Sequence, residues 1–561
     1  MFRSWLGLAL ALHLVLATSY AWCTPDFEGP DENAHYEYAW HIANAGKLPL
    51  TPALAQQRGL PQTEGVGLAH HAPLYYALLA GVLVATGRDD TTFGPLLNPD
   101  FGKPGARGEH LKFQHGQGVH PVLLLLRLVS VLLGACSIAL VHRLGRAACP
   151  DAPRVADLAA LLVACLPMWS FLHGVLNNDV LAATASCAGV LALVRCSQAE
   201  RTSLRHAFAV GGTLGAALLT KLTTLFLLPL AAVVFALAAR RDRRALGHGA
   251  IAAAIALALA GWVFVRNHQL CGDWLALHAH DALFPPLPPE LRWPVLRDAF
   301  LPNIFASLFG TFGWFSLKPH AALLWTGGVV ASLAALGLLR AALGRERCGW
   351  PRPAWLLGLV LLLVFAGTVK FNWTAPQPQG RLLFPAIGPA AVFVAAGLVR
   401  ASAGLRQRRW LALLLPLVAF AVLLAWFRPA FAIANAPAPA WHRALVGSIV
   451  RADVGPTIAW QDPESSARGL VLHWRDPDAP AGTRYSLYAY DAHGRVWLAT
   501  HEWTHGDLVV QGEQFAVPDV ALTMLPRDTE LRFVLRRIPI HASDDVATAP
   551  RSAALPVRMP R

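Results

Sequence analysis

The chain has 561 residues, of which 55% are hydrophobic and 14% are charged, and its formal net charge is +13. Soluble domains carry about 25% charged residues, so this composition excludes an ordinary soluble protein and predicts a polytopic membrane protein. The basic residues cluster in short loops between apolar spans, as the positive-inside rule describes, so the net charge does not indicate a nucleic-acid partner.

The first apolar run extends from Trp5 to Trp22, and its 18 residues are enough to cross a membrane. Arg3 before the run and small residues near its end are also typical of a signal peptide. We predict an uncleaved anchor, because cleavage would release the acidic segment that follows from the membrane.

The segment directly after this run predicts a short helix at the membrane surface, over Asp31–Ala45. Pro30 suits the first helical position, where a missing N–H costs nothing. Gly46 can end the helix, and Pro49 prevents a restart.

Two acids begin this helix, within a first outer loop over residues 24–71. Asp31 and Glu32 fall in the predicted first turn, where the helix dipole favours negative charge, and His35 lies one turn on from Asp31 on the same face. The dipole should keep Asp31 ionised, as a general base requires. A well-capped surface helix without a catalytic role would show the same pattern.

Ten further apolar spans follow the first loop, each flanked by short polar segments. With the amino terminus inside, the basic loops all fall on the cytoplasmic side, which gives eleven spans and places the tail outside. The expected spans are about 120–142, 157–176, 180–194, 207–219, 223–239, 249–265, 320–340, 354–370, 382–399 and 410–427.

Two apolar segments leave the number of membrane spans undetermined. Ala72–Thr86 has only 15 residues, and we predict a horizontal or re-entrant element on the outer face. If this segment crosses instead, every later basic loop lands outside unless another span is gained or lost. Residues 303–317 are ambiguous in the same way, so the prediction is a mainly α bundle of about 11–13 spans.

The composition changes after Phe427. We divide the chain into a transmembrane domain over 1–427, a linker over 428–445, a small β-sandwich over 446–545 and a tail over 546–561. Alternating runs predict the strands, and Asp491–Gly494 is a hairpin signal between two of them. The expected strands are Leu470–Trp474, Tyr485–Tyr490, Val496–Thr500, Leu508–Val510 and Leu531–Leu535. The His and Trp residues of this domain could bind sugar, although ordinary sheet packing explains them as well.

Cations on the expected outer side run against the general charge bias, and four of them stand out: Lys221, Arg266, Lys370 and Arg381. A lipid phosphate at the outer leaflet needs such groups, and arginine offers a bidentate fork. Snorkelling at span ends would also explain each of them. Arg381 is the strongest candidate, because Gly380 would let the backbone approach a ligand closely.

A divalent metal is a further possibility. Asp31 and His35 are suitable ligands, with Glu64 or His70 as a third, but spacing fixes no third ligand. The eight cysteines form no CxxC pair, which argues against a zinc cluster or a disulfide framework. The sequence has no P-loop and predicts no nucleotide cofactor.

Five motifs in order resemble the GT-C superfamily of membrane glycosyltransferases, which includes the protein O-mannosyltransferases and the lipid A aminoarabinose transferases. The resemblance covers roughly residues 5–427 and is closest to an uncharacterised bacterial membrane-protein family of that superfamily. The motifs are PDENAHYEYAWHIANAGKLP from Pro30, HHAPLYYALLAGV from His70, Asn177–Asp179, the segment from Thr220 through Lys221, and GRLLFPAIGPA from Gly380. Ala72 replaces the first proline of the family's HPPLYY pattern.

This resemblance implies an inverting transferase that moves a sugar from a polyprenyl-phosphate donor to a glycan, lipid or protein acceptor. It places the protein in the bacterial cytoplasmic (inner) membrane, with the chemistry and the carboxy-terminal domain outside. Asp31 matches the catalytic acid of the first loop, and Glu32 matches the second acid of the pair. We expect the substrate-binding residues to be His35, His71, Tyr75, Asn178, Asp179, Lys221, Arg266, Gln379 and Arg381.

The transferase hypothesis requires Asp31 and Arg381 in one cavity, on opposite sides of one anomeric carbon. We expect a gap of roughly 7–15 Å between their charged groups and no salt bridge, which would neutralise both. The alternatives are a transporter or lipid-sugar flippase, and a non-catalytic scaffold for the β-domain. Most apolar spans carry no ionisable residue at their centre, where transport sites usually lie, and a scaffold leaves the acidic helix unexplained.

Overall fold

The computed structural model describes most of the apolar region and the strands of the carboxy-terminal region. The described residues are 5–60, 65–88, 110–113, 120–283, 286, 289–343, 351–402, 414–432, 459–460, 464–466, 469–475, 484–490, 496–499, 503–504, 514–517, 530–538 and 555–558.

The apolar region is helical throughout. Its first half contains α1 (Trp5–Cys23), α2 (Glu32–Ala45), α3 (Pro52–Gln57), α4 (Leu74–Ala85), α5 (His120–Ala148), α6 (Pro153–Ala164), α7 (Pro167–Leu172), α8 (Asp179–Gln198), α9 (Leu204–Leu218), the 3₁₀ helix η2 (Leu222–Phe226) and α10 (Leu227–Ala239). Its second half contains α11 (Arg244–Cys271), α12 (Leu277–Leu283), α13 (Pro289–Val295), η3 (Leu296–Phe300), α14 (Leu301–Gly310), α15 (Ala321–Leu343), α16 (Ala354–Thr374), η4 (Gly380–Ala386), α17 (Ile387–Ala401), α19 (Leu414–Ala421), η5 (Val422–Phe427) and α20 (Arg428–Ala432).

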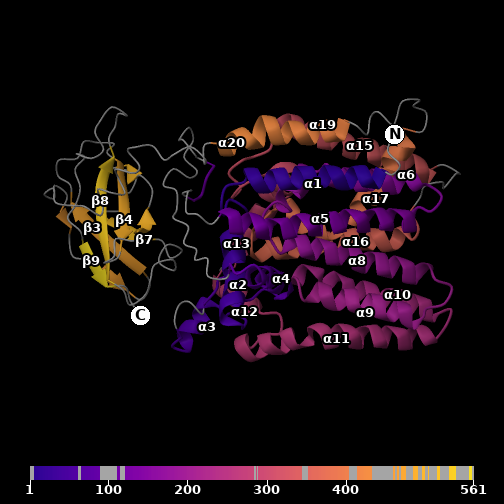
Figure 1. Ribbon diagram of the computed structural model, residues 1–561, viewed down its shortest axis with the longest axis horizontal. Helices are drawn as coiled ribbons and strands as arrows, with labels where there is room; N and C mark the ends of the chain where they lie inside the picture. The colour runs from indigo at the N-terminus through magenta and orange to yellow at the C-terminus, as the bar shows by residue number, and fades with distance from the viewer. Residues whose placement is uncertain are drawn as a thin grey trace. The chain divides into compact units, whose positions relative to one another are not determined.

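The chain divides into two compact units, Met1–Phe93 with Gln117–Phe431 and Gly94–Gly116 with Ala432–Arg561. In the first unit the long helices run side by side, and Figure 1 shows the short helices α2, α3, α4, α12 and α13 gathered at one end of them. This arrangement confirms the predicted helical bundle and puts the acidic segment after α1 at that end.

Nine helices of the described residues are long and apolar enough to cross a membrane, so the chain is a multi-pass membrane protein. The expected count was about 11–13 spans, and nine helices of the described residues meet this criterion of length and composition. The predicted span 157–176 is interrupted between α6 and α7, because Pro167 starts a new helix. The predicted span 207–219 is present as α9, which has only 15 residues.

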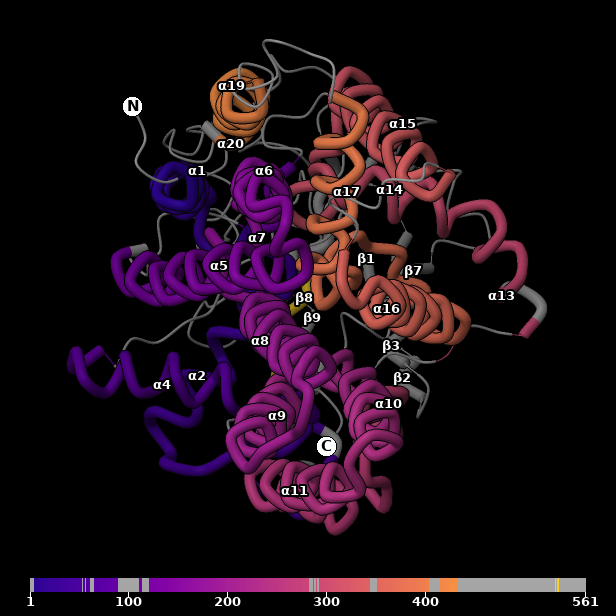
Figure 2. The backbone as a smooth tube through the Cα atoms, turned by 90° about the vertical axis from the view of Figure 1, so that its right-hand side faces the viewer, coloured from indigo at the N-terminus to yellow at the C-terminus, as the bar shows by residue number. Residues whose placement is uncertain are grey.

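The ambiguous segment Ala72–Thr86 forms α4, an apolar helix of 12 residues. Figure 2 shows α1 and α19 nearly end-on and α4 lengthwise, so α4 crosses the direction of the bundle. A 12-residue helix rises about 18 Å, which is well short of the hydrocarbon core of a bilayer. Residues 303–317 hold the end of the short helix α14 and a turn closed by Phe312 and Leu317.

The acidic helix is present but begins one residue later than expected. Asp31 precedes α2 in the left-handed conformation, with φ 60°, so it is not part of the first helical turn. The dipole argument therefore applies to Asp31 as a flanking residue only. Gly46 ends the helix, as predicted, with φ 63° and its N–H bonded to the carbonyl of Ile42.

Aromatic side chains form the core where α1 meets the turn after α14. Tyr20, Phe171, Phe312 and Phe427 pack together, and two of their pairs are edge to face, with ring centroids 4.6 Å apart for Tyr20 and Phe427 and 5.1 Å apart for Phe171 and Phe312. This packing fixes the turn that carries Trp314, whose indole contacts the loop before α2.

The carboxy-terminal unit contains strands in two antiparallel sheets, with orders β1-β3-β2 and β5-β4-β8-β9, while β7 pairs with β3 and β6 pairs with β4. The strands are β1 (Ala459–Trp460), β2 (Glu464–Ser466), β3 (Gly469–Arg475), β4 (Arg484–Tyr490), β5 (Val496–Ala499), β6 (Trp503–Thr504), β7 (Gln514–Val517), β8 (Glu530–Ile538) and β9 (Leu555–Arg558). The predicted strand Leu508–Val510 lies outside the described residues. β9 falls in the segment expected to be a tail, and the β-sandwich itself stays a prediction.

Helices α15 and α17 approach so closely that glycine is required at their crossing. A Cβ added at Gly337 would overlap the backbone of Gly397, and one added at Gly397 would overlap the backbone of Ala334. Small residues at such a crossing let helix backbones pack against each other within a membrane.

We expect Gly337→Ala to lower the midpoint of thermal unfolding of the detergent-solubilised protein, since overpacking costs about 1–3 kcal/mol. Gly328→Ala in the same helix is the matched control, because a Cβ there meets nothing within 4 Å. Equal midpoints for the two variants would show that the crossing tolerates a methyl group.

Candidate functional site

Four charged side chains from distant parts of the sequence meet at the start of α2. The Arg381 guanidinium donates from Nη2 to Asp31 Oδ2 at 3.1 Å and lies 3.7 Å from Asp179 Oδ2 through Nη1. Lys221 Nζ contacts Asp179 Oδ1 at 2.5 Å. We call Asp31, Asp179, Lys221 and Arg381 the ion cluster.

Each member of the ion cluster stands at the start of a helical segment. Asp31 precedes α2, Asp179 is the first residue of α8, Lys221 precedes η2 and Arg381 is the second residue of η4. Helix amino termini favour negative charge, which suits the two carboxylates, and the two cations then balance them. The resulting group has two positive and two negative charges in one place.

Burial differs within the ion cluster. The side chains of Asp179 and Arg381 are 2% and 6% exposed, whereas that of Asp31 is 44% exposed. Burial alone would raise the pKa of Asp31, but the positive charge of Arg381, with its hydrogen bond, and of Lys221 lowers that pKa below its ordinary value of 3.8. Asp31 is therefore an ionised carboxylate that retains contact with solvent.

The expected proximity of Asp31 and Arg381 is met, but the expected gap of 7–15 Å between them is wrong, since the two groups form a salt bridge of 3.1 Å. The physical reason is desolvation. A guanidinium that is only 6% exposed needs anionic partners, and Asp31 and Asp179 are the carboxylates within reach.

Beside the ion cluster, His35 and His71 are linked through the Tyr76 hydroxyl, which lies 3.0 Å from Nδ1 of each ring. Asn178 Nδ2 donates to His71 Nδ1 at 3.1 Å, so that nitrogen is an acceptor. The single lone pair of that nitrogen is then shared between Asn178 and the Tyr76 hydroxyl, and the Tyr76 oxygen is free to accept His35 Nδ1–H. Burial lowers the pKa of His35 to about 3 and that of His71 well below its ordinary value, so both rings are neutral.

Two other predicted residues lie apart from the ion cluster. The Tyr75 hydroxyl is buried against Ser130 Oγ at 2.9 Å and accepts the N–H of Asn177 at 3.1 Å, so it fastens α4 to the bundle. Arg266 donates to the Pro49 carbonyl at 2.7 Å and holds the segment that follows α2. Both residues therefore have structural contacts, and their substrate-binding roles stay predictions.

Gln379 and Gly380, at the start of η4, position Arg381. Gln379 Oε1 accepts a hydrogen bond from Arg381 Nε, so its side chain orients the guanidinium. A Cβ added at Gly380 would lie 2.9 Å from the Ile304 carbonyl and closer still to the backbone of Leu308. The glycine therefore permits close approach to α14, not to a ligand as the sequence suggested.

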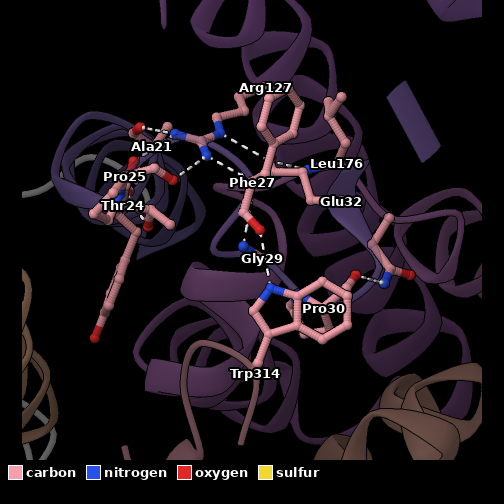
Figure 3. Close-up of polar contacts among 12 residues, drawn as sticks. Ala21, Thr24, Pro25, Phe27, Gly29, Pro30, Glu32, Arg127, Leu176 and Trp314 are labelled. Atoms are coloured by element: carbon pink, nitrogen blue, oxygen red, sulfur yellow. Dashed lines mark hydrogen bonds and ion pairs between the residues drawn. The ribbon is translucent and has the colours of Figure 1, made fainter. Parts of the chain in front are cut away.

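Glu32, expected as the second catalytic acid, faces away from the ion cluster. It forms a salt bridge of 2.7 Å with Arg127, and both side chains are fully buried (Figure 3). Because its carboxylate is fully buried, Glu32 cannot contact a substrate and does not act as the second catalytic acid in this conformation. Arg127 was not among the predicted site residues, although an arginine inside the apolar run 120–142 is a visible signal of a functional or structural role.

The metal hypothesis does not fit the contacts made by its candidate ligands. Asp31 is engaged by a guanidinium, and His35 Nδ1 is bonded to Tyr76. Glu64 lies outside the described residues. Within the part of the chain that the structure describes, no three His, Cys, Asp or Glu side chains are grouped so that they could hold a metal ion, so no chemical step is derived through one.

The family model described as "Predicted membrane protein (DUF2142)" matches residues 114–388, which is just under half of the chain. The matched region contains Arg127, Asp179, Lys221 and Arg381 but not Asp31. A search of curated proteins found no match to the sequence.

Solved structures with a similar arrangement include three membrane proteins. The structure of ArnT from Cupriavidus metallidurans bound to undecaprenyl phosphate is 16% identical, has a TM-score of 0.46, and aligns over 81% of this chain and 82% of that one. The Archaeoglobus fulgidus oligosaccharyltransferase is 15% identical over 79% of this chain and 58% of that one, with a TM-score of 0.41. The Pmt1-Pmt2 protein O-mannosyltransferase of S. cerevisiae is 15% identical over 53% and 38%, with a TM-score of 0.34.

Proposed function

We propose that this protein is an inverting membrane glycosyltransferase that uses a polyprenyl-phosphate-linked sugar. The observation that carries the proposal is the ion cluster, in which Arg381 joins a solvent-accessible carboxylate, Asp31, to the buried pair of Asp179 and Lys221. A base and a phosphate-binding cation are the two groups that such a transfer needs.

In the proposed reaction Asp31 accepts the proton of an acceptor hydroxyl as the hydroxyl oxygen attacks the anomeric carbon. The new C–O bond forms while the bond to the phosphate oxygen breaks, and the lipid phosphate leaves with the electron pair. Asp31 is suited to this role because it is ionised and 44% exposed, so an acceptor can reach it.

The leaving phosphate gains negative charge, which the cations of the ion cluster would stabilise. Arg381 offers a planar fork and Lys221 a point charge, and both are held in place by Asp179. The Asp31–Arg381 salt bridge must open for a sugar to lie between the base and the leaving phosphate. The contacts of both cations with Asp179 can persist, so the cations are already held in place as the charge develops.

A polar atom next to the ion cluster offers a place for a sugar hydroxyl. Asn178 Oδ1 is buried and has no hydrogen-bond partner among the described residues, while its Nδ2 is bound to His71. Buried acceptors of this kind are usually satisfied, and a hydroxyl of the donor sugar would satisfy this one.

The transporter or flippase alternative is less well supported. Transport sites lie near the bilayer midplane, between broken helices of two repeats. The ion cluster instead lies at the starts of helical segments, by the short helices at one end of the bundle. We propose that this end lies at the outer face of a bacterial inner membrane, where a glycan, lipid or protein acceptor would be available. The carboxy-terminal domain is proposed to be extracytoplasmic as well.

The function is tested without knowing the sugar, by mass spectrometry of the glycans and glycolipids of the cell envelope. We expect a strain that lacks the gene to lose one sugar modification and to accumulate its polyprenyl-phosphate donor. Complementation with the wild-type gene should restore both, whereas the Asp31→Asn gene should restore neither. Identical envelopes in all strains would rule the proposal out.

The pH dependence of transfer follows from the lowered pKa of Asp31. A carboxylate acts as a base above its pKa, so a lowered value extends activity to lower pH. We expect the initial rate in reconstituted vesicles to stay flat from pH 7 to about pH 5. An acidic limb with its midpoint near neutral pH would indicate a different base.

A further inference from the structure

A buried ion pair lies outside the ion cluster, and the proposed reaction gives it no role. Arg127 on α5 donates from Nε to Glu32 Oε1 at 2.9 Å and from Nη2 to Glu32 Oε2 at 2.7 Å, which is the bidentate geometry of a strong pair (Figure 3). Both side chains are 0% exposed. Burying two charges costs free energy, so such a pair usually has further contacts that compensate for the lost hydration. The further contacts of this pair indicate its structural role.

The remaining donors of Arg127 bind the backbone where α1 ends. Nη1 donates to the carbonyls of Ala21 and Thr24 at 2.8 and 2.7 Å, and Nη2 donates to the Pro25 carbonyl at 2.9 Å. The last carbonyls of a helix have no partner within the helix, so Arg127 caps α1 and ties its end to α5.

The carboxylate of Glu32 binds two further segments. Oε1 accepts the N–H of Leu176, in the segment between α7 and α8, at 2.9 Å. Oε2 accepts the N–H of Gly29 at 3.2 Å. Through these contacts the pair fixes both ends of the loop 24–31, which leads from α1 to Asp31.

The backbone of the loop 24–31 adopts an energetically unfavourable conformation at two residues. Phe27 and Asp31 adopt left-handed φ values of 63° and 60°, although neither is glycine. Such conformations persist only where the surroundings impose them. Two further contacts help to hold the loop, because Trp314 Nε1 donates to the Phe27 carbonyl at 3.0 Å and Asn177 Nδ2 donates to the Pro30 carbonyl at 3.3 Å (Figure 3).

We propose that the Glu32–Arg127 pair is a positioning device, which imposes the left-handed conformation of Asp31 and so aims its carboxylate at Arg381. Glu32 is the residue next to Asp31, so any movement of its anchored side chain moves the base directly. This inference rests on the proposed role of Asp31 as the base. It assigns Glu32 and Arg127 to the geometry of the reaction, with no contact to substrate.

The test removes both charges at once with the double variant Arg127→Met/Glu32→Leu, because a single change would leave one buried charge unpaired. We expect kcat to fall about 10²-fold, the loss that a misplacement of about 1 Å causes, while the KM for the donor changes little. Hydrogen exchange followed by mass spectrometry should show lost amide protection in residues 24–34.

Two readouts separate positioning from a general structural role. In the Asp31→Asn background the same double variant should cause almost no further loss, because the group that it positions is already disabled. With Asp31 intact, the acidic limb of the pH profile should move upward, since a displaced carboxylate loses the Arg381 charge that lowers its pKa.

The matched control is Arg352→Met/Asp151→Leu, which removes an ion pair of 2.9 Å whose side chains are 67% and 58% exposed. It should leave kcat and the protection of residues 24–34 unchanged. Trp314→Phe is a milder second variant that keeps an aromatic ring but removes one hydrogen bond to the loop. We expect Trp314→Phe to lower kcat by about 2–10-fold, which is the effect of one hydrogen bond. If the double variant does not fold, the result for Trp314→Phe decides whether the conformation of the loop positions Asp31.

Three outcomes overturn the inference. The first is unchanged protection of residues 24–34 in the double variant, and the second is an equal loss of rate with Asp31 or Asn at that position. The third is wild-type kcat in Trp314→Phe despite lost protection in the loop. Full activity of Asp31→Asn alone would instead overturn the proposed base, and the exchange data would still show whether the pair holds the loop.

Discussion

The substitution Asp31→Asn should reduce transfer by about 10²–10⁴-fold, the usual contribution of a positioned general base. Asparagine keeps the shape of the side chain and tolerates the left-handed φ of 60° that this position requires. It also still accepts a hydrogen bond from Arg381. Asp179 remains as an anionic partner of Arg381, so the variant should still fold and insert into the membrane, and its loss of rate can be attributed to basicity.

The measurement is the initial rate of sugar transfer in vesicles, with the donor identified from the gene-deletion strain. Asp281→Asn is the matched control, since Asp281 is a carboxylate on the short helix α12 whose side chain is 51% exposed. It should retain full activity. A rate for Asp31→Asn within a few-fold of the wild type would remove Asp31 from the role of base.

The helices were largely predictable from the sequence because apolar length and glycine or proline at the ends are local signals. Gly46 ends α2 where expected, and strands β3, β4 and β5 fall where alternation placed them. The left-handed Asp31 was not predictable, because its conformation depends on Arg127, which is 96 residues further along the chain.

The approach of Asp31 and Arg381 was inferred from the function that the resemblance implied, since nothing local links residues 350 apart. Which of two neighbouring tyrosines joins the histidines depends on the rotation of α4. Tyr76 bonds to His35 and His71, whereas Tyr75, the residue chosen from the sequence, points toward Ser130. Helical phase is set by tertiary packing, so a motif alone does not decide it.

The role of Glu32, the second acid of the motif, was also not predictable from the sequence. Asp31 and Glu32 are adjacent, so their side chains point in different directions. Asp31 reaches the ion cluster with its side chain 44% exposed, whereas Glu32 forms a fully buried pair with Arg127. A sequence motif treats them as equivalent acids. Burial separates them, because a fully buried carboxylate bound to a guanidinium and two backbone N–H groups has no capacity left for a substrate.

The substitution Arg381→Lys tests the cation that joins the two carboxylates. Lysine keeps the positive charge but has a single ammonium group, whereas the guanidinium reaches Asp31 through Nη2 and Asp179 through Nη1. The charge balance of the buried cluster is preserved, so the fold should be retained. The planar fork proposed for the leaving phosphate is lost.

We expect kcat and kcat/KM for the donor to fall together, by about 10²–10³-fold, because the charge on the phosphate is greatest in the transition state. A change confined to KM would instead indicate a cation that only holds the donor in its ground state. Lys370→Gln, which removes an exposed cation of α16, is the control and should leave both constants unchanged. If Arg381→Lys and Lys370→Gln behave alike, Arg381 is an ordinary partner of Asp31 and Asp179, and the cation that meets the phosphate must be sought at Lys221.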